Sequence, residues 1–323
     1  MSQPISKFWP GFDAAFRSGR FMKADPQISG LAICSVMLEM CFGDQVLAKG
    51  TGWFWRQPDG VALVTAWHNF SGLHHTIRKP MSRHGGLPDR VRYHYMATEP
   101  QTFQDAEIPL YLDDERSQPR WFVHPVYGSY LDMAFLMLEI KGGQVACVND
   151  TVPVLTAPAR PAYDVFAVGF PQGVRMINVF PVWKRGTIAS DPDLPVEGHP
   201  KFYVDMAGRG GLSGAPVYRV QQGVVVDRDV GGHSIGFGEK TEFLGLYSGR
   251  AADQLPPDAR TGESTDLGFV WRADVVLEML NARVLDECPE VGKGAVTMTD
   301  VWRKPGEEDK PGGDMGDEGP PPG

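Results

Sequence analysis

The chain has 323 residues, of which 42% are hydrophobic and 22% are charged, and its formal net charge is −9. This composition is that of a globular protein, so wholesale disorder, collagen and coiled coil are excluded. A general nucleic-acid binder would carry a basic surplus, so no nucleic-acid partner is expected. The 38 Gly and 27 Pro are many for a helical protein and are typical of an all-β chain with tight turns.

Residues 1–27 are expected to form an N-terminal extension. Trp9, Phe12 and Phe16 recur at helical spacing, which predicts a short amphipathic helix. No secretory signal is expected, because this segment lacks a basic stretch followed by an apolar one. No transmembrane segment or membrane partner is expected either, because the most apolar run, residues 30–42, is short and contains an acid.

Four cysteines are present: Cys34, Cys41, Cys147 and Cys288. Cys34 and Cys41 fall in one segment that we expect to be extended. At roughly 3.3 Å per residue their Cα atoms would lie about 23 Å apart, which is too far for a disulfide. We interpret the four side chains as buried thiols in a reducing compartment, and we therefore expect a cytoplasmic protein.

Short β-rich runs fill the chain from about residue 30 to 270, usually separated by Gly, Pro, Asn or Asp. We predict strands over residues 31–41, 51–55, 61–65, 133–140, 165–169, 179–183, 202–205, 215–220, 243–246 and 268–271. This pattern predicts a β-barrel or β-sandwich architecture. Residues 80–120 are polar and charged with little periodicity, and we interpret them as a long surface insertion.

The pattern changes to helical spacing near the C-terminus. Residues 275–286 predict a helix whose apolar face is formed by Val276, Met279, Leu280 and Val284. Asp274 is its candidate N-cap, and Pro289 forbids its continuation. A C-terminal extension follows over 289–323. From about residue 303 more than half of the residues are Gly or Pro and most others are charged, so we predict a disordered tail.

Three short segments carry candidate chemistry. His68 ends the run Thr-Ala-Trp-His after an apolar strand, Asp132 stands at the head of the apolar run Met-Ala-Phe-Leu, and Ser213 lies in Gly-Gly-Leu-Ser-Gly-Ala-Pro. A lone histidine or aspartate at a strand end is more often structural than catalytic. The conjunction of His, Asp and Ser in this order, within a β-rich chain, is far less frequent by chance than each residue alone.

The chemistry of acyl transfer explains why these residue types belong together. A serine hydroxyl is a poor nucleophile at neutral pH and needs a base to take its proton. An imidazole fulfils this role and then protonates the leaving amine, provided that a buried carboxylate fixes its tautomer. Glycines around Ser213 permit positive φ, which turns the N–H groups of Gly211 and Ser213 toward one developing oxyanion.

These segments resemble those of trypsin-like serine peptidases of the chymotrypsin fold, and the sequence is most similar to bacterial Deg/HtrA-type protease domains, without a PDZ domain. Four weaker segments follow the family's order: residues 168–173, 185–190, 244–249 and 267–270. The resemblance covers about 28–288. It implies an all-β peptidase domain of two packed antiparallel β-barrels, over about 28–152 and 162–272, followed by the C-terminal helix at about 275–286.

The resemblance also implies an activity and the residues that perform it. The activity is serine endopeptidase: hydrolysis of peptide bonds in protein substrates through an acyl-enzyme on Ser213. His68 would be the base, Asp132 its partner, and the amides of Gly211 and Ser213 the oxyanion hole. Ser248 would hydrogen-bond the aspartate. No metal or organic cofactor is implied, and the partner is a protein or peptide substrate.

Substrate-binding residues follow from the same resemblance. Tyr247, Gly249 and Arg250 would present a strand to an extended peptide. Ala207 stands where trypsins carry the aspartate of their S1 pocket, so a small or medium apolar residue before the scissile bond is expected rather than Arg or Lys. An acidic residue drawn by Arg250 is the less favoured alternative.

The sequence departs from the family at two further positions. Leu212 replaces the acid that pairs with a newly cut N-terminus in digestive members, so no activation by N-terminal trimming is expected. Asn69 stands where secreted members usually carry a cysteine.

Other classes fit the motifs less well. An α/β-hydrolase elbow needs Gly at position 215, where this chain has Ala. No Lys-Ser/Thr pair follows the glycines at 208–214, which argues against a phosphate loop. His74 and His75 lack zinc-ligand spacing. A trypsin-fold binding or scaffold protein with an unused cleft remains the alternative function, and a regulatory partner or a homo-oligomer is left open.

Overall fold

The computed structural model describes residues 29–82, 84–98, 101–140, 144–154, 159–175, 180–229, 232–250 and 266–287. The predicted N-terminal helix, Cys288 and the predicted tail lie outside these ranges. Within the described residues, no helix is long and apolar enough to cross a membrane.

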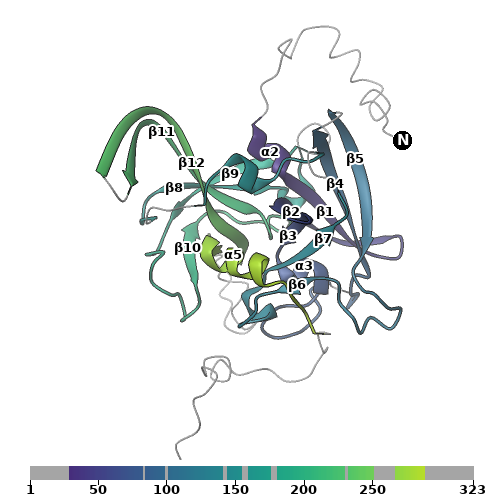
Figure 1. Cartoon of the computed structure of the whole chain (residues 1–323). Coiled ribbons are helices and arrows are strands. Elements are labelled where there is room, and N and C mark those ends of the chain that lie inside the picture. Colours follow the sequence, from purple (N-terminus) through teal and green to yellow (C-terminus); the bar gives the residue numbers. More distant parts are fainter. Residues whose placement is uncertain are drawn as a thin grey trace, which may run out of the picture.

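Strands dominate the described chain (Figure 1). They are β1 (Ser35–Phe42), β2 (Gln45–Gln57), β3 (Gly60–Thr65), β4 (Arg90–Thr98), β5 (Gln101–Pro109), β6 (Phe122–Val123), β7 (Ala134–Leu138), β8 (Asp164–Gly169), β9 (Val182–Ile188), β10 (Lys201–Asp205), β11 (Pro216–Asp229), β12 (Gly232–Arg250), β13 (Leu267–Arg272) and β14 (Val284–Leu285). The helices are α2 (Gly30–Cys34), α3 (Trp67–Ser71), α4 (Val148–Thr151) and α5 (Ala273–Ala282), with 3-10 turns η2 (Ser129–Leu131) and η3 (Pro171–Gly173).

Eight antiparallel strands form the first sheet, in the order β14-β6-β7-β3-β2-β1-β4-β5. Strand β3 buries every residue after Gly60, as expected for a short apolar strand at the centre of a sheet. It pairs with β7, and Thr65 lies opposite Ala134. The segment that leaves β3 and the segment that enters β7 therefore meet at one end of the sheet, where His68 and Asp132 are found.

Six strands form the second sheet, a barrel in the order β10-β13-β12-β11-β8-β9 that closes through the pairing of β9 with β10. Its core includes Phe202, Val204, Leu212 and Val217. The hairpin of β11 and β12 continues well beyond the barrel (Figure 1). The two antiparallel sheets and the few helices confirm the all-β, chymotrypsin-like fold class.

An apolar cluster joins the two sheets to helix α5. Trp53 of β2 packs against Phe243 of β12, with ring centroids 5.1 Å apart. Val276, Met279 and Leu280 of α5 belong to the same buried cluster. Figure 1 shows α5 in front of the junction between the sheets. Helix α5 therefore stabilises the packing of the two sheets against each other.

Two expectations about local structure were wrong. Residues 31–34 belong to helix α2, so the first strand begins only at Ser35. Residues 90–109 are a hairpin of the first sheet rather than a surface insertion. The outward side chains of this hairpin are charged and pair across the strands, as Arg92 does with Glu107. These charges made the polar and apolar alternation of the two strands hard to recognise in the sequence.

The predicted C-terminal helix differs at both ends. Arg272 is the N-cap residue and Asp274 lies in the first turn. Arg283 has φ 52°, and this left-handed residue ends the helix. Val284 is therefore not on the apolar helix face; it belongs to β14, which pairs with β6.

The segment after α5 ties the C-terminal part of the described chain to the first sheet. The Asp286 carboxylate accepts hydrogen bonds from the indole N–H groups of Trp67, at 2.7 Å, and Trp121, at 2.8 Å. The Asp286 backbone N–H also donates to the Trp121 carbonyl. Both tryptophans are fully buried. Trp67 directly precedes His68, so this carboxylate fixes the element on which His68 is carried.

We expect Asp286→Ala to lower the free energy of unfolding by about 3 kcal/mol, because two buried indole donors lose a charged acceptor. Urea denaturation of the purified protein measures this loss. Asp286→Asn keeps an acceptor oxygen and is expected to lose about half as much. Equal stability of Asp286→Ala and the wild type would show that the tryptophans find other acceptors.

Candidate active site

His68 and Asp132 are hydrogen-bonded at the end of the first sheet. The Nδ1 atom of His68 lies 2.9 Å from Oδ2 and 3.0 Å from Oδ1 of Asp132. The backbone N–H of His68 also donates to Asp132 Oδ1, at 3.0 Å. His68 is the second residue of α3, and Asp132 follows η2 in a left-handed conformation with φ 44°. The contact fixes the imidazole with Nδ1 toward the carboxylate and Nε2 away from it.

Asp132 is almost completely buried, with 2% of its side chain exposed. Burial acts to raise its pKa, but the neighbouring His68 and the hydrogen bonds from His68 and Ser248 outweigh burial and hold the pKa well below its ordinary range. Ser248 Oγ donates to Asp132 Oδ2. The β12–β13 pairing shifts register between Tyr247 and Gly249, at Ser248. The carboxylate therefore remains ionised at neutral pH.

Ser213 lies on a tight turn whose glycines have positive φ, 91° at Gly211 and 88° at Gly214. A side chain at Gly211 would lie 2.5 Å from the Phe170 carbonyl oxygen, and one at Gly214 would collide with the Thr51 carbonyl oxygen. Only glycine combines this conformation with such close packing. The two glycines therefore fix the course of the backbone on either side of Ser213.

The Ser213 turn is held by Thr51 of β2 and by Asn69 of α3. The Ser213 carbonyl accepts hydrogen bonds from the Thr51 backbone N–H and from Asn69 Nδ2, both at 3.1 Å. Thr51 Oγ1 donates to the Gly211 carbonyl at 2.7 Å. Asn69 follows His68 in α3, so one short helix carries the imidazole and also contacts the serine turn.

The backbone N–H groups of Gly211 and Ser213 are available to a ligand. No described residue accepts a hydrogen bond from either group, whereas Leu212 N–H donates to the Arg209 carbonyl and Gly214 N–H to the Tyr247 carbonyl. Two free amides beside a serine hydroxyl are suited to bind an oxyanion.

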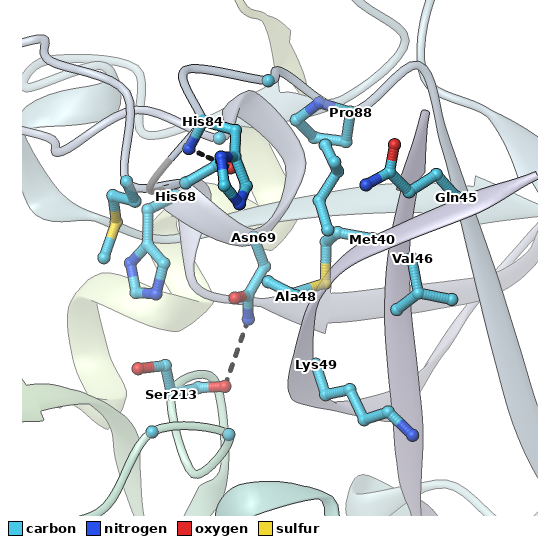
Figure 2. Close-up of a pocket in the computed structure, with 17 residues that line it drawn as sticks. Met40, Gln45, Val46, Ala48, Lys49, His68, Asn69, His84, Pro88 and Ser213 are labelled. Atoms are coloured by element: carbon cyan, nitrogen blue, oxygen red, sulfur yellow. Dashed lines mark hydrogen bonds between the residues drawn. The ribbon is translucent and has the colours of Figure 1, made fainter. Parts of the chain in front are cut away.

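His68 and Ser213 line the same cavity, which has a volume of about 550 Å³. Figure 2 shows the His68 imidazole above Ser213 in that view, at one end of the cavity. Between these two described residues there is no direct hydrogen bond, and Ser213 is linked to α3 through Asn69. In the ranges that the structure describes, no three His, Cys, Asp or Glu side chains gather to hold a metal ion.

The remaining predicted residues lie next to the serine turn in the second barrel. Leu212 is fully buried in the barrel core. Tyr247 is 1% exposed, and its backbone pairs with Gly214 and Ala215. Gly249 and Arg250 end β12, and Ala207 is half-buried just before Gly208.

The sequence reasoning missed the roles of Thr51, Asn69 and His75. Thr51 carried no signal beyond its place in a predicted strand. Asn69 was singled out only as the residue that stands where secreted members usually carry a cysteine. His75 lies 3.8 Å from Asp132 Oδ2 and stacks on His74 with ring centroids 5.1 Å apart. The contacts of Thr51 with Gly211, of Asn69 with Ser213 and of His75 with Asp132 join segments that are distant in the chain, so no local pattern reveals them.

Buried histidines should make the protein sensitive to acid. Burial lowers the pKa of His75 from 6.5 to about 3 and that of His199 from 6.5 to about 4. Between pH 6.5 and about 4 the unfolded chain binds protons that the folded chain does not. The free energy of unfolding should therefore fall as pH falls, by up to about 1.4 kcal/mol per pH unit for each histidine.

Urea denaturation at pH 7, 6, 5 and 4.5 measures this slope. Burial also lowers the pKa of His124. His199→Gln removes one of these histidines and is expected to reduce the slope. An unfolding free energy that stays constant over this range would contradict the prediction.

No protein-family model and no curated protein sequence matches this chain. Solved structures do match. One is the active form of the Rv3671c protease from M. tuberculosis, with 17% identity and a TM-score of 0.43 over 80% of this chain and 87% of that one. A second is the serine endoprotease from Yersinia pestis, with 11% identity and a TM-score of 0.43 over 80% and 67%. A third is the MamO protease domain from Magnetospirillum magneticum, with 14% identity and a TM-score of 0.40 over 77% and 96%. Each of these three neighbours is described as a protease or a protease domain.

Proposed function

We propose that this protein is a serine endopeptidase that hydrolyses peptide bonds of protein substrates through an acyl-enzyme on Ser213. The observation that carries the proposal is the pairing of His68 with the buried Asp132 at the end of a cavity that Ser213 also lines. The free amides of Gly211 and Ser213 support it. In a trypsin-fold scaffold protein none of these features would be needed.

The proposal gives each group a role. Asp132 accepts the Nδ1 proton of His68, so Nε2 carries the lone pair that takes the Ser213 proton. Ser213 Oγ then bonds to the substrate carbonyl carbon, and the carbonyl oxygen becomes an oxyanion bound by the two amides. His68 returns the proton to the leaving amine, and a water molecule activated by His68 hydrolyses the ester. Ser248 stabilises the ionised Asp132 throughout.

The acyl half of the substrate is proposed to pair as a strand with residues 247–250. Leu212 is buried in the barrel core and carries no charge for a new N-terminal ammonium, which supports an enzyme that needs no N-terminal trimming. Ala207 provides no carboxylate for an Arg or Lys side chain.

We also propose that the enzyme works in a reducing compartment, the cytoplasm. Cys34, Cys41 and Cys147 are buried free thiols. Burial raises the pKa of Cys34 and of Cys147 to about 12, so both remain protonated and unreactive at neutral pH. Among the described residues the fold thus contains these cysteines as thiols and not as disulfides, which is typical of proteins in a reducing compartment.

A fluorophosphonate probe tests the proposal, because it reacts with a serine only where a base and an oxyanion site activate that serine. We expect stoichiometric labelling of the wild type, with mass spectrometry placing the adduct on Ser213, and none for Ser213→Ala. Folded wild-type protein that stays unlabelled by several such probes, and that cleaves no member of a proteome-derived peptide library, would instead favour a binding or scaffold function.

A further inference from the structure

The side chain of Tyr247 fills a space in the second barrel beside the serine turn. Its ring lies between Gly208 and Gly268: a Cβ atom at Gly208 would collide with the tyrosine hydroxyl, and one at Gly268 would lie 2.5 Å from its Cε2 atom. Only 1% of Tyr247 is exposed. The two glycines thus make room for a phenol ring that occupies the volume between them.

If the substrate pairs with residues 247–250 as proposed, its side chain before the scissile bond lies beside this space. The Tyr247 carbonyl accepts the Gly214 N–H at 2.7 Å, directly after Ser213, and the next residue, Ser248, contacts Asp132. A peptide paired with residues 247–250, with its carbonyl at the Gly211 and Ser213 amides, directs that side chain toward Gly208. Because the phenol is already there, only a small side chain has room.

Open space exists on the other side of Ser213. The cavity of about 550 Å³ begins at His68, Gly211 and Ser213 and extends over the β1–β2 hairpin, and none of residues 207–209 or 247–250 lines it. Its wall carries a group of apolar side chains, Met40, Val46, Leu47, Met81 and Pro88, beside polar ones such as Gln45, Ser82 and His84. Figure 2 labels Met40, Val46 and Pro88 of this group. Val46 is 38% and Met81 53% exposed, so part of this apolar surface is unoccupied.

The charges at this cavity give no reason to expect an acidic ligand. Lys49 is the lysine on its wall, and its Nζ lies 3.0 Å from Glu39. The positive charge of Lys49 is therefore already balanced by the Glu39 carboxylate on the neighbouring strand. An apolar side chain gains the most from this wall, because it removes exposed methionine and valine surface from water.

We propose that the enzyme recognises its substrates mainly after the scissile bond: a small residue precedes the bond, and a large aliphatic residue in the first two positions after it occupies the apolar cavity. This rests on the proposed peptidase function and names the substrate class of that site. The occupant is the leaving half of the same substrate, because the cavity is continuous with Ser213 and His68.

Cleavage of a proteome-derived peptide library by the wild type tests the proposal directly. We expect Gly, Ala or Ser before the cleaved bonds and Leu, Ile, Met or Val enriched in the two positions after them. Large residues before the bond, or no enrichment after it, would overturn the proposal. In either case the labelling of Ser213 by a fluorophosphonate reports independently on the peptidase function.

Changing the cavity wall provides a second test. Met81→Glu should lower kcat/KM for the best peptide about tenfold or more, since lost apolar contacts in a substrate pocket have effects of this size. Its fluorophosphonate labelling rate should equal that of the wild type, because the small probe does not reach the wall. Leu194→Glu is the matched control, since Leu194 is 63% exposed and does not line the cavity. Equal kcat/KM for both variants would contradict the proposal.

Opening the filled space is the third test. In Tyr247→Ala, the ratio of kcat/KM for cleavage after Leu or Met to kcat/KM for cleavage after Ala should rise tenfold or more. Tyr247→Leu removes the ring but keeps an apolar core residue, and it replaces the alanine variant if that variant does not fold. A folded variant that shows no gain would overturn the role of Tyr247.

Discussion

Ser213→Ala is expected to lower kcat on the best peptide substrate by about four to six orders of magnitude, leaving the protein folded. The Ser213 hydroxyl oxygen is the atom that would bond to the substrate carbonyl carbon. Ser82 also lines the cavity, but Ser213 is the serine on the turn that carries the two amides. The residual rate would come from substrate binding and the amides alone. Single-turnover and steady-state kinetics with one quenched fluorescent peptide measure the loss.

Ser248→Ala is the matched serine control for this experiment. Ser248 is 1% exposed and contacts Asp132 rather than the cavity. Loss of one hydrogen bond to a buried charge corresponds to about 1.5–3 kcal/mol, so activity should fall by roughly 10- to 100-fold. A Ser213→Ala protein as active as Ser248→Ala would show that the nucleophile is another group.

Asp132→Asn is expected to lower kcat by about 10⁴-fold at neutral pH. The carboxylate accepts the Nδ1 proton of His68, whereas an asparagine amide can present its NH₂ group to the same nitrogen. The imidazole would then carry its proton on Nε2 and would have no lone pair for the Ser213 hydroxyl. KM should change little, since Asp132 is buried and does not touch the cavity.

The rate of fluorophosphonate labelling separates this effect from misfolding. It should fall with kcat in Asp132→Asn, while the circular dichroism spectrum and the urea midpoint show whether the fold is kept. His75→Gln changes the other imidazole near Asp132 and is expected to keep most of the activity, because His75 does not line the cavity. A folded Asp132→Asn variant with near wild-type kcat would refute the role of the carboxylate.

The residues of the candidate site that lie in short sequence motifs could be predicted from the sequence. His68, Asp132 and Ser213 each lie at the edge of an apolar strand or in a glycine turn, so local sequence marks them. Thr51 and Asn69 were not assigned their contacts, because the partner of each lies more than 140 residues away along the chain. Such contacts exist only once both sheets are assembled.

The strength of the local sequence signal also explains which strands and helices were predicted correctly. Strands such as β3, buried on nearly every residue, were found because an apolar run bounded by turns is a strong signal. The β4–β5 hairpin was missed because its outward positions carry Arg, His, Asp and Glu in cross-strand pairs. Helix α2 was missed because Leu-Ala-Ile-Cys is compatible with either conformation, and packing of the neighbouring segments decides between them.

The hydrogen bond from the Trp67 indole to the Asp286 carboxylate has a consequence for synthesis of the chain. Strand β14 and Asp286 come last among the described elements, yet they border β6 and hold the residue next to His68. A ribosome-bound fragment that stops before them would carry all three reactive side chains without this anchor. We expect such nascent fragments to be far less competent in proteolysis than the released chain, which would protect other newly made proteins while translation is still in progress.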